Sequence, residues 1–140
     1  MILLEIGLAY VYSHVLEYYA HKFLHRFKKK HQPLAFHLRE HHAQAWRNNM
    51  HDTPSLREAT LLGCIALMHS PLLLVSPPAF WTLVFCAMSY LYVHTRSHMD
   101  IKWAMNNVPW HVDHHLGNHK ANWGVRKPWI DILLGTRVPK

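Results

Sequence analysis

Histidine is the residue type whose number and spacing point to chemistry. The chain of 140 residues has 15 histidines but only 8 Asp and Glu together. Residues three or four positions apart share one face of an α-helix, with Cβ atoms about 5–6 Å apart, close enough to chelate one metal ion. Nine histidines follow this spacing, and His42 directly follows one of them, which makes ten in four boxes: His21-x3-His25, His37-x3-His41-His42, His94-x3-His98 and His111-x2-His114-His115. The pattern predicts a metal-binding protein.

The two histidine doublets indicate that more than one metal ion is bound. Neighbouring residues on a helix point about 100° apart, so that each doublet can serve two different ions. Ten imidazoles are enough for two ions with four or five ligands each. Imidazole suits Zn, Fe, Cu or Ni, and ligand type alone does not choose among them. The sequence has neither the HExxH motif of zinc proteases nor a Glu-x-x-His motif of ferritin-like di-iron bundles.

Other polar residues near the boxes are expected to support the metal ligands. A ligating imidazole usually donates its second ring N–H to a carboxylate, a carbonyl or water, which fixes the orientation of the ring. The candidates for this role are Glu17, Asp100, Asp113 and Asp131. The histidines outside the boxes are not expected to be ligands: His14, His31, His51, His69 and His119. We expect His14, like Glu17, to lie behind the ligands or to line a substrate path.

Apolar helices must position these boxes. Between Arg57 and Arg96 the chain has no basic residue and a single acid, Glu58. The pair Pro77-Pro78 divides this stretch, because proline lacks a backbone N–H and restricts the residue before it. Each arm has about 17–19 residues and would be roughly 25–28 Å long, close to the ~30 Å hydrocarbon core of a bilayer. We expect a transmembrane helical hairpin with a short turn at the prolines; the alternative is a buried hairpin in a soluble protein.

The N-terminal residues 1–20 predict a third apolar helix, interrupted by Glu5, His14 and Glu17. This stretch lacks the basic start and the cleavage site of a signal peptide, and it either spans the membrane or lies at its interface. The basic cluster at residues 22–30 places this end, and both ends of the hairpin, on the cytoplasmic side. All four boxes then lie at one membrane face. A membrane orientation of this kind explains the basic excess behind the formal net charge of +7, and no nucleic-acid partner is expected.

The expected fold class is therefore all-α: an integral membrane helical bundle of about three spans with a cytoplasmic, histidine-rich helical cap. The length suits one domain over residues 1–140. Residues 26–57 and 99–140 would form the cap. Cys64 and Cys86 are too few for a disulfide framework.

The boxes resemble those of the fatty acid hydroxylase/sterol desaturase superfamily, the membrane di-iron oxygenases that act on lipids. The segment Glu17-Tyr18-x2-His21-x3-His25 is similar to the first box of fatty acid 2-hydroxylases, and the box that begins at His94 is similar to their third. The second box has one residue more than the usual H-x2-HH of the family, so that the match rests on His41 and His42 more than on His37. The C-terminal part resembles the end of the family through His111, His114, His115, Gly124, Asp131, Gly135 and Thr136. The resemblance covers about residues 14–137.

The resemblance implies an activity. Two iron ions, which zinc can replace in purified protein, would use O2 as co-substrate to hydroxylate a C–H bond of a lipid or fatty acyl chain. No catalytic residue beyond the metal centre is needed. The electrons would come from a separate cytochrome b5, ferredoxin or reductase, since the chain has no cytochrome b5-like domain. A sterol or carotenoid hydroxylase or desaturase, a non-enzymatic metal-binding membrane protein, and a homologue without turnover remain the alternatives.

Overall fold

The computed structural model describes residues 1–139, and these residues form helices and loops without a β-strand. The all-helical class is thereby confirmed. In chain order the helices are α1 (Ile2–Leu24), the π-helix η1 (His37–His42), α2 (Ala43–Arg47), α3 (Leu56–Met68), α4 (Leu72–Val75), α5 (Pro77–Met99), α6 (Ile101–Asn107), α7 (Pro109–Leu116) and α8 (Trp129–Leu133).

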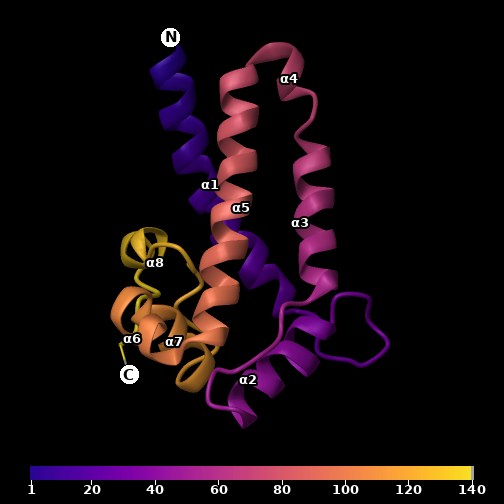
Figure 1. Ribbon diagram of the computed structural model, residues 1–140, viewed down its shortest axis with the longest axis vertical. Helices are drawn as coiled ribbons and strands as arrows, with labels where there is room; N and C mark the ends of the chain where they lie inside the picture. Colours follow the sequence, from indigo (N-terminus) through magenta and orange to yellow (C-terminus); the bar gives the residue numbers. More distant parts are fainter. Residues whose placement is uncertain (140) are drawn as a thin grey trace.

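The long helices define the tall part of the molecule (Figure 1). Helix α1 packs along α5, and α3 packs against α5 as well. Apart from the short α4, which lies at the upper end, the shorter helices and the C-terminal loops gather toward the lower end, where α1 and α5 both finish (Figure 1). Because the boxes lie at the ends of the long helices or in the short ones, this arrangement brings them together.

Helices α3 and α5 form the expected helical hairpin, but the predicted position of its turn was wrong. Helix α3 ends at Met68, where the ring of His69 bonds back to the carbonyl of Ile65 (2.7 Å). The connection contains the short α4, and Pro77 and Pro78 are the first residues of α5. Proline is well tolerated there, because the N–H groups of the first helical turn have no partner within the helix. The proline pair therefore starts the second arm and does not form the turn.

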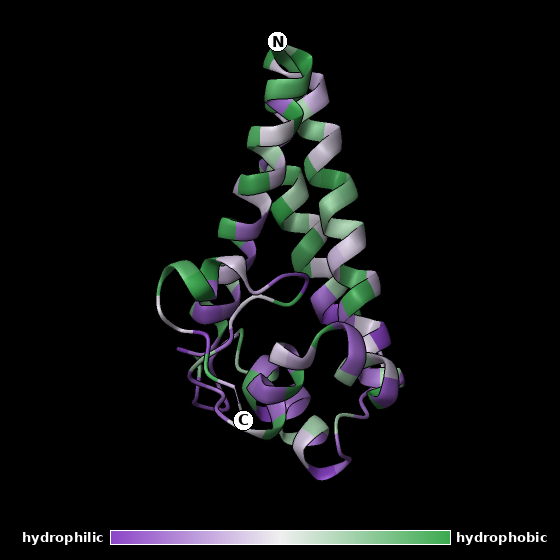
Figure 2. Ribbon diagram, turned by 90° about the vertical axis from the view of Figure 1, so that its left-hand side faces the viewer, coloured by the Kyte–Doolittle hydropathy of each residue, from purple (hydrophilic) through white to green (hydrophobic). Residues whose placement is uncertain are grey.

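Hydropathy divides the molecule along its long axis (Figure 2). Hydrophobic residues predominate in the helices of the upper part, whereas hydrophilic residues are concentrated in the lower part (Figure 2). Large apolar side chains, among them Leu3, Leu74 and Val75, are exposed at the upper end. Within residues 1–139, no helix combines the length and the apolar character needed to cross a membrane.

The lower part has a small apolar core of its own. Helices α6 and α7 enclose Met50 together with Ala104, Val108 and Val112. Asp100 caps α6 by accepting a hydrogen bond from the backbone N–H of Trp103 (3.0 Å). This core packs α7, with its histidines, against α6, and Val93 of α5 also packs against it.

Candidate metal centre

The ten box histidines form a single buried cluster. None of their side chains exposes more than 8% of its surface. The end of α1 supplies the first box, η1 the second, the last turns of α5 the third and α7 the fourth. Segments as distant in sequence as α1 and α7 thus contribute to one site.

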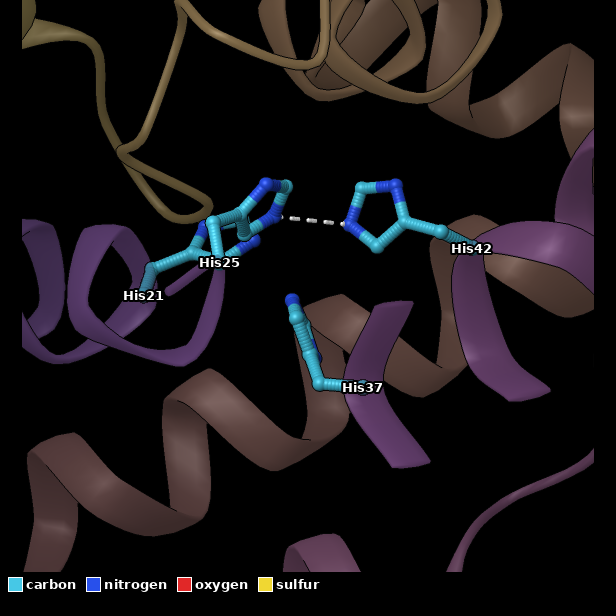
Figure 3. A group of neighbouring side chains, drawn as sticks. All are labelled: His21, His25, His37 and His42. Atoms are coloured by element: carbon cyan, nitrogen blue, oxygen red, sulfur yellow. Dashed lines mark hydrogen bonds between the residues drawn. The ribbon is translucent and has the colours of Figure 1, made fainter. Parts of the chain in front are cut away.

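Ring nitrogens of these histidines converge in two places. Within each group of four, one nitrogen per residue lies within 4.8 Å of the other three. Figure 3 shows the side chains of the first group turned toward one another from α1 and η1. The first group is His21, His25, His37 and His42, and the second is His41, His94, His98 and His115.

The two remaining box histidines each adjoin one group. Nε2 of His114 lies 3.3 Å from Nε2 of His42, in the first group. Nε2 of His111 lies 3.2 Å from Nε2 of His98, in the second. The doublets thus divide between the groups, as their spacing predicts.

The π-helix explains how the second box serves both groups. A π-helix closes hydrogen bonds from residue i to i+5, so that one turn is a residue longer than an α-turn. In η1, the residues four and five positions after His37 both return to its side. The ring centroids of His41 and His42 lie 5.3 and 4.9 Å from that of His37. The extra residue of this box is accommodated by the wider turn.

The cluster favours neutral imidazoles. Burial lowers the pKa of His37 to about 3, against the opposing effect of the Glu58 carboxylate. Burial and the neighbouring rings also hold the pKa of His42, His114 and His115 well below the usual value. A neutral imidazole has a free lone pair and is the form that binds metals.

Several buried nitrogens have no hydrogen-bond partner among the described residues. They include Nε2 of His21, His37, His41 and His94, and both ring nitrogens of His115. Leaving buried polar atoms unpaired is unfavourable. Nε2 of His25 also faces Nε2 of His42 at 3.1 Å (Figure 3). Converging lone pairs of this kind fit a cation between them, so the residues present suit a bound metal ion.

Backbone carbonyls fix the orientation of three of the rings. Because a carbonyl can only accept, the Nδ1 atom of each ring must donate, which leaves Nε2 for a metal. The three pairs are His21 with Trp123 (2.7 Å), His98 with Met50 (2.7 Å) and His114 with Ala121 (2.6 Å).

Two carboxylates that sequence reasoning missed lie against the histidines. Asp52 accepts a hydrogen bond from Nδ1 of His41 (2.6 Å). Glu58, in the first turn of α3, has carboxylate oxygens 3.7 Å from Nδ1 of His37 and 3.4 Å from Nδ1 of His94. Its position as the one acid of the long apolar stretch was a signal that could have identified it.

The acids that were predicted to support the ligands make other contacts. Glu17 is buried against Arg126, with 2.6 Å between Oε2 and Nε, and also accepts from backbone N–H groups of the same loop. Asp113 pairs with Arg137 (3.1 Å). Asp100 caps α6. Their predicted role behind the ligands stays a prediction.

Asp131 acts on the site through the loop before it. Its fully buried carboxylate accepts hydrogen bonds from the backbone N–H groups of Trp123 (2.8 Å) and Gly124 (2.7 Å) and from the hydroxyl of Thr136 (2.7 Å). A Cβ atom at Gly124 would collide with the Lys127 carbonyl, so the tight loop requires glycine there. This loop provides two of the carbonyls that hold the ligand rings.

None of the histidines outside the boxes belongs to either group, although the ring of His119 lies 6.3 Å from that of His25, centroid to centroid. His31, His51 and His119 are exposed. Nε2 of His69 lies 3.0 Å from the hydroxyl of Tyr12. His14 is buried on α1.

A mainly apolar cavity of about 100 Å³ lies between α1, α3 and α5 and reaches the histidines. His21, His37 and Glu58 line its polar end. On α1 its lining runs from Ser13 to Leu24, about 16 Å at 1.5 Å per residue. Its apolar wall includes Leu61, Leu62, Ile65, Leu83 and Ala87.

Together these features define an all-helical protein with a buried, histidine-lined candidate metal site at the end of an apolar cavity. The sequence matches the family model described as fatty acid hydroxylase over residues 6–136. The chain therefore belongs to the fatty acid hydroxylase family. Comparisons with curated proteins and with solved structures give no match. The predicted superfamily is confirmed at this level, and the similarity to 2-hydroxylases stays a prediction.

Proposed function

We propose that this protein is an O2-dependent oxygenase that hydroxylates a C–H bond of a lipid or fatty acyl substrate. The observation that carries the proposal is the pair of buried four-histidine groups, the first of which reaches the apolar cavity through His21 and His37. Membership of the fatty acid hydroxylase family supports an oxidoreductase of this kind. When bound, two iron ions would supply the reduction of O2 and the insertion of one oxygen atom into the substrate.

The proposal assigns the ten box histidines as ligands, five to each ion. His114 completes the first group and His111 the second, through the short Nε2 contacts with His42 and His98. The chain's contribution is to hold these rings neutral, to fix their tautomers through Nδ1 and to keep the site dry.

The cavity provides the place for the apolar part of the substrate. Its aliphatic wall excludes water and favours a hydrocarbon chain. Arg126, the basic residue of the lining, is already paired with the buried Glu17. The wall therefore has no unpaired positive charge for an acid group, and the carbons of the substrate, not its head group, would approach His21 and His37.

We also propose that the protein works at a membrane. The exposed apolar side chains at the end remote from the histidines, such as Leu3, Leu74 and Trp81, favour contact with lipid. The basic segment at residues 22–30 lies at the opposite end, beside the first box, and suits the cytoplasmic face. An external cytochrome b5, ferredoxin or reductase would deliver the electrons.

Metal analysis combined with a lipid oxidation assay tests this function. Detergent-purified protein reconstituted with Fe(II) should hold about two iron ions per chain, as ten imidazoles in two groups imply. It should convert lipid to hydroxylated product only with O2 and a reductant. The variant His94→Ala should lose metal and product, whereas the exposed His51→Ala should keep both.

Each other outcome has a definite meaning. Two bound ions without oxidation of any lipid, sterol or carotenoid would contradict the enzyme and favour a metal-binding role. A desaturated or sterol product would correct the reaction or the substrate within the same family. Protein without metal after reconstitution would refute the proposal.

A further inference from the structure

Glu58 is a largely buried carboxylate that lies beside the histidines and is not among the ten assigned ligands. It lies in the first turn of α3 and lines the polar end of the cavity. The exposed fraction of its side chain is 12%, and its Oε1 atom is buried without a hydrogen-bond partner among the described residues. A buried carboxylate oxygen without a partner is unfavourable unless a positive charge or a donor compensates it.

The groups that surround this carboxylate are imidazoles of both histidine groups. Oε1 lies 3.7 Å from Nδ1 of His37, which belongs to the first group. Oε2 lies 3.4 Å from Nδ1 of His94, which belongs to the second. The Nδ1 atom of His41 is 3.9 Å from Oε1, but its closer partner is Asp52 at 2.6 Å.

We propose that Glu58 is a positioning residue shared by the two metal sites, holding His37 through one carboxylate oxygen and His94 through the other. This inference rests on the proposed metal centre. With Nδ1 of both rings donating to Glu58, both Nε2 atoms, which are buried and unpartnered, are left for metal ions. The three rings held by backbone carbonyls, and His41 held by Asp52, each have a separate acceptor. Glu58 is the carboxylate that joins the groups.

The partial positive charge on each Nδ1–H increases when Nε2 binds a cation, so metal binding strengthens both contacts. The separations of 3.4 and 3.7 Å are then expected to shorten. Because one carboxylate receives both rings, its removal should weaken both metal sites. Removal of Asp52 should weaken the second group only, since His41 belongs there.

Competition between the purified protein and a chromophoric zinc chelator tests this difference. Glu58→Ala should lower the affinity for both zinc ions, by about 10- to 100-fold each, the usual effect of removing the outer partner of a ligating histidine. Asp52→Ala should lower the affinity for one ion. Glu40→Ala, which removes an exposed carboxylate paired with Arg57, should change neither. Glu58→Gln preserves the side-chain shape and should weaken at least one site.

The visible spectrum of the Co(II)-loaded protein gives a second readout, since it reports ligand geometry directly. It should change in Glu58→Ala and Glu58→Gln and stay the same in Glu40→Ala, with circular dichroism showing that the metal-free variants are folded. Unchanged affinities in both Glu58 variants, or a loss confined to one ion in Glu58→Ala, would overturn the shared role. The readout is metal affinity, so the result stands whether or not the wild type oxidises lipid. Wild-type protein that takes up fewer than two ions would overturn this inference and the proposed function together.

Discussion

Replacing Asp131 by Asn should destabilise the protein far more than an ordinary surface substitution. The buried carboxylate receives two backbone N–H groups, from Trp123 and Gly124, and the hydroxyl of Thr136. The amide of the Asn side chain keeps one oxygen that can accept a hydrogen bond. Its NH2 group would face a backbone N–H that also needs an acceptor, so that this N–H is left without a partner. A hydrogen bond to a charged group contributes about 1.5–3 kcal/mol, and an unsatisfied buried donor costs about 1–3 kcal/mol. We expect the free energy of unfolding to fall by about 3 kcal/mol.

That loss is large against a total stability of about 5–15 kcal/mol. With an unfolding entropy of about 2.1 cal/mol/K per residue, a chain of 140 residues has about 0.3 kcal/mol/K. The midpoint of thermal unfolding should therefore fall by roughly 10 °C. Circular dichroism of the metal-free protein during heating and during urea titration measures both quantities.

Asp113→Asn is the matched control. Asp113 has one ionic partner, Arg137, and both side chains are partly exposed, at 15% and 23%. Such pairs contribute about 0–1 kcal/mol. Equal stabilities of the Asp131 and Asp113 variants would refute the claim that the Asp131 carboxylate holds the loop at residues 121–126. The same loop carries the carbonyls that orient His21 and His114, so Asp131→Asn should also bind metal less tightly.

Three further predictions concern burial and charge. Glu17→Ala leaves the buried Arg126 without its carboxylate partner, and the free energy of unfolding in urea should fall by about 3–5 kcal/mol. The double variant Glu17→Ala/Arg126→Met removes the unpaired charge and should be more stable than the single variant. Equal stabilities of the two variants would show that the unpaired charge is not the cause. The metal-free protein should lose stability as the pH falls from about 6.5 toward 3. The reason is that the pKa of His37 is about 3 in the folded state, so that the unfolded chain takes up the proton at a higher pH than the folded chain. Urea unfolding at pH 7.5 and at pH 5 measures this change, and a higher stability at pH 5 would contradict the prediction. His42→Ala should lower the metal content and the exposed His31→Ala should not, as elemental analysis would show; full metal content in His42→Ala would remove it from the ligand set.

The sequence could predict the helices and the assembly of the boxes because both depend on local spacing. The i, i+4 pairs at His21 and His94 place two rings on one helix face, and these helices bring the pairs into one cluster. The apolar stretch on either side of Pro77 likewise predicts two helical arms.

The partners of the ring nitrogens could not be predicted in the same way. Nδ1 of His21 meets a carbonyl more than a hundred residues later, and Nδ1 of His98 meets the carbonyl of Met50. Every residue has a backbone carbonyl, so no sequence pattern indicates which carbonyls accept a hydrogen bond from a histidine ring. The predicted turn of the hairpin was misplaced for a different reason. Proline is unfavourable in a helix interior but favourable in the first turn of a helix. The pair Pro77-Pro78 is therefore compatible both with a turn and with the start of a helix.

The π-helix of the second box has a consequence for how such proteins diverge. In an α-helix, the residues three and four positions after a histidine lie on the same side of the helix as that histidine. In a π-helix, the residues four and five positions after it lie on that side. A single inserted codon can thus change H-x2-HH to H-x3-HH while the three rings keep their places, provided that the turn widens. Motif searches with fixed gaps would discard a homologue of this kind, although its ligand geometry is preserved. In this chain the wider turn keeps His41 and His42 beside His37, although the box has one residue more than the usual spacing.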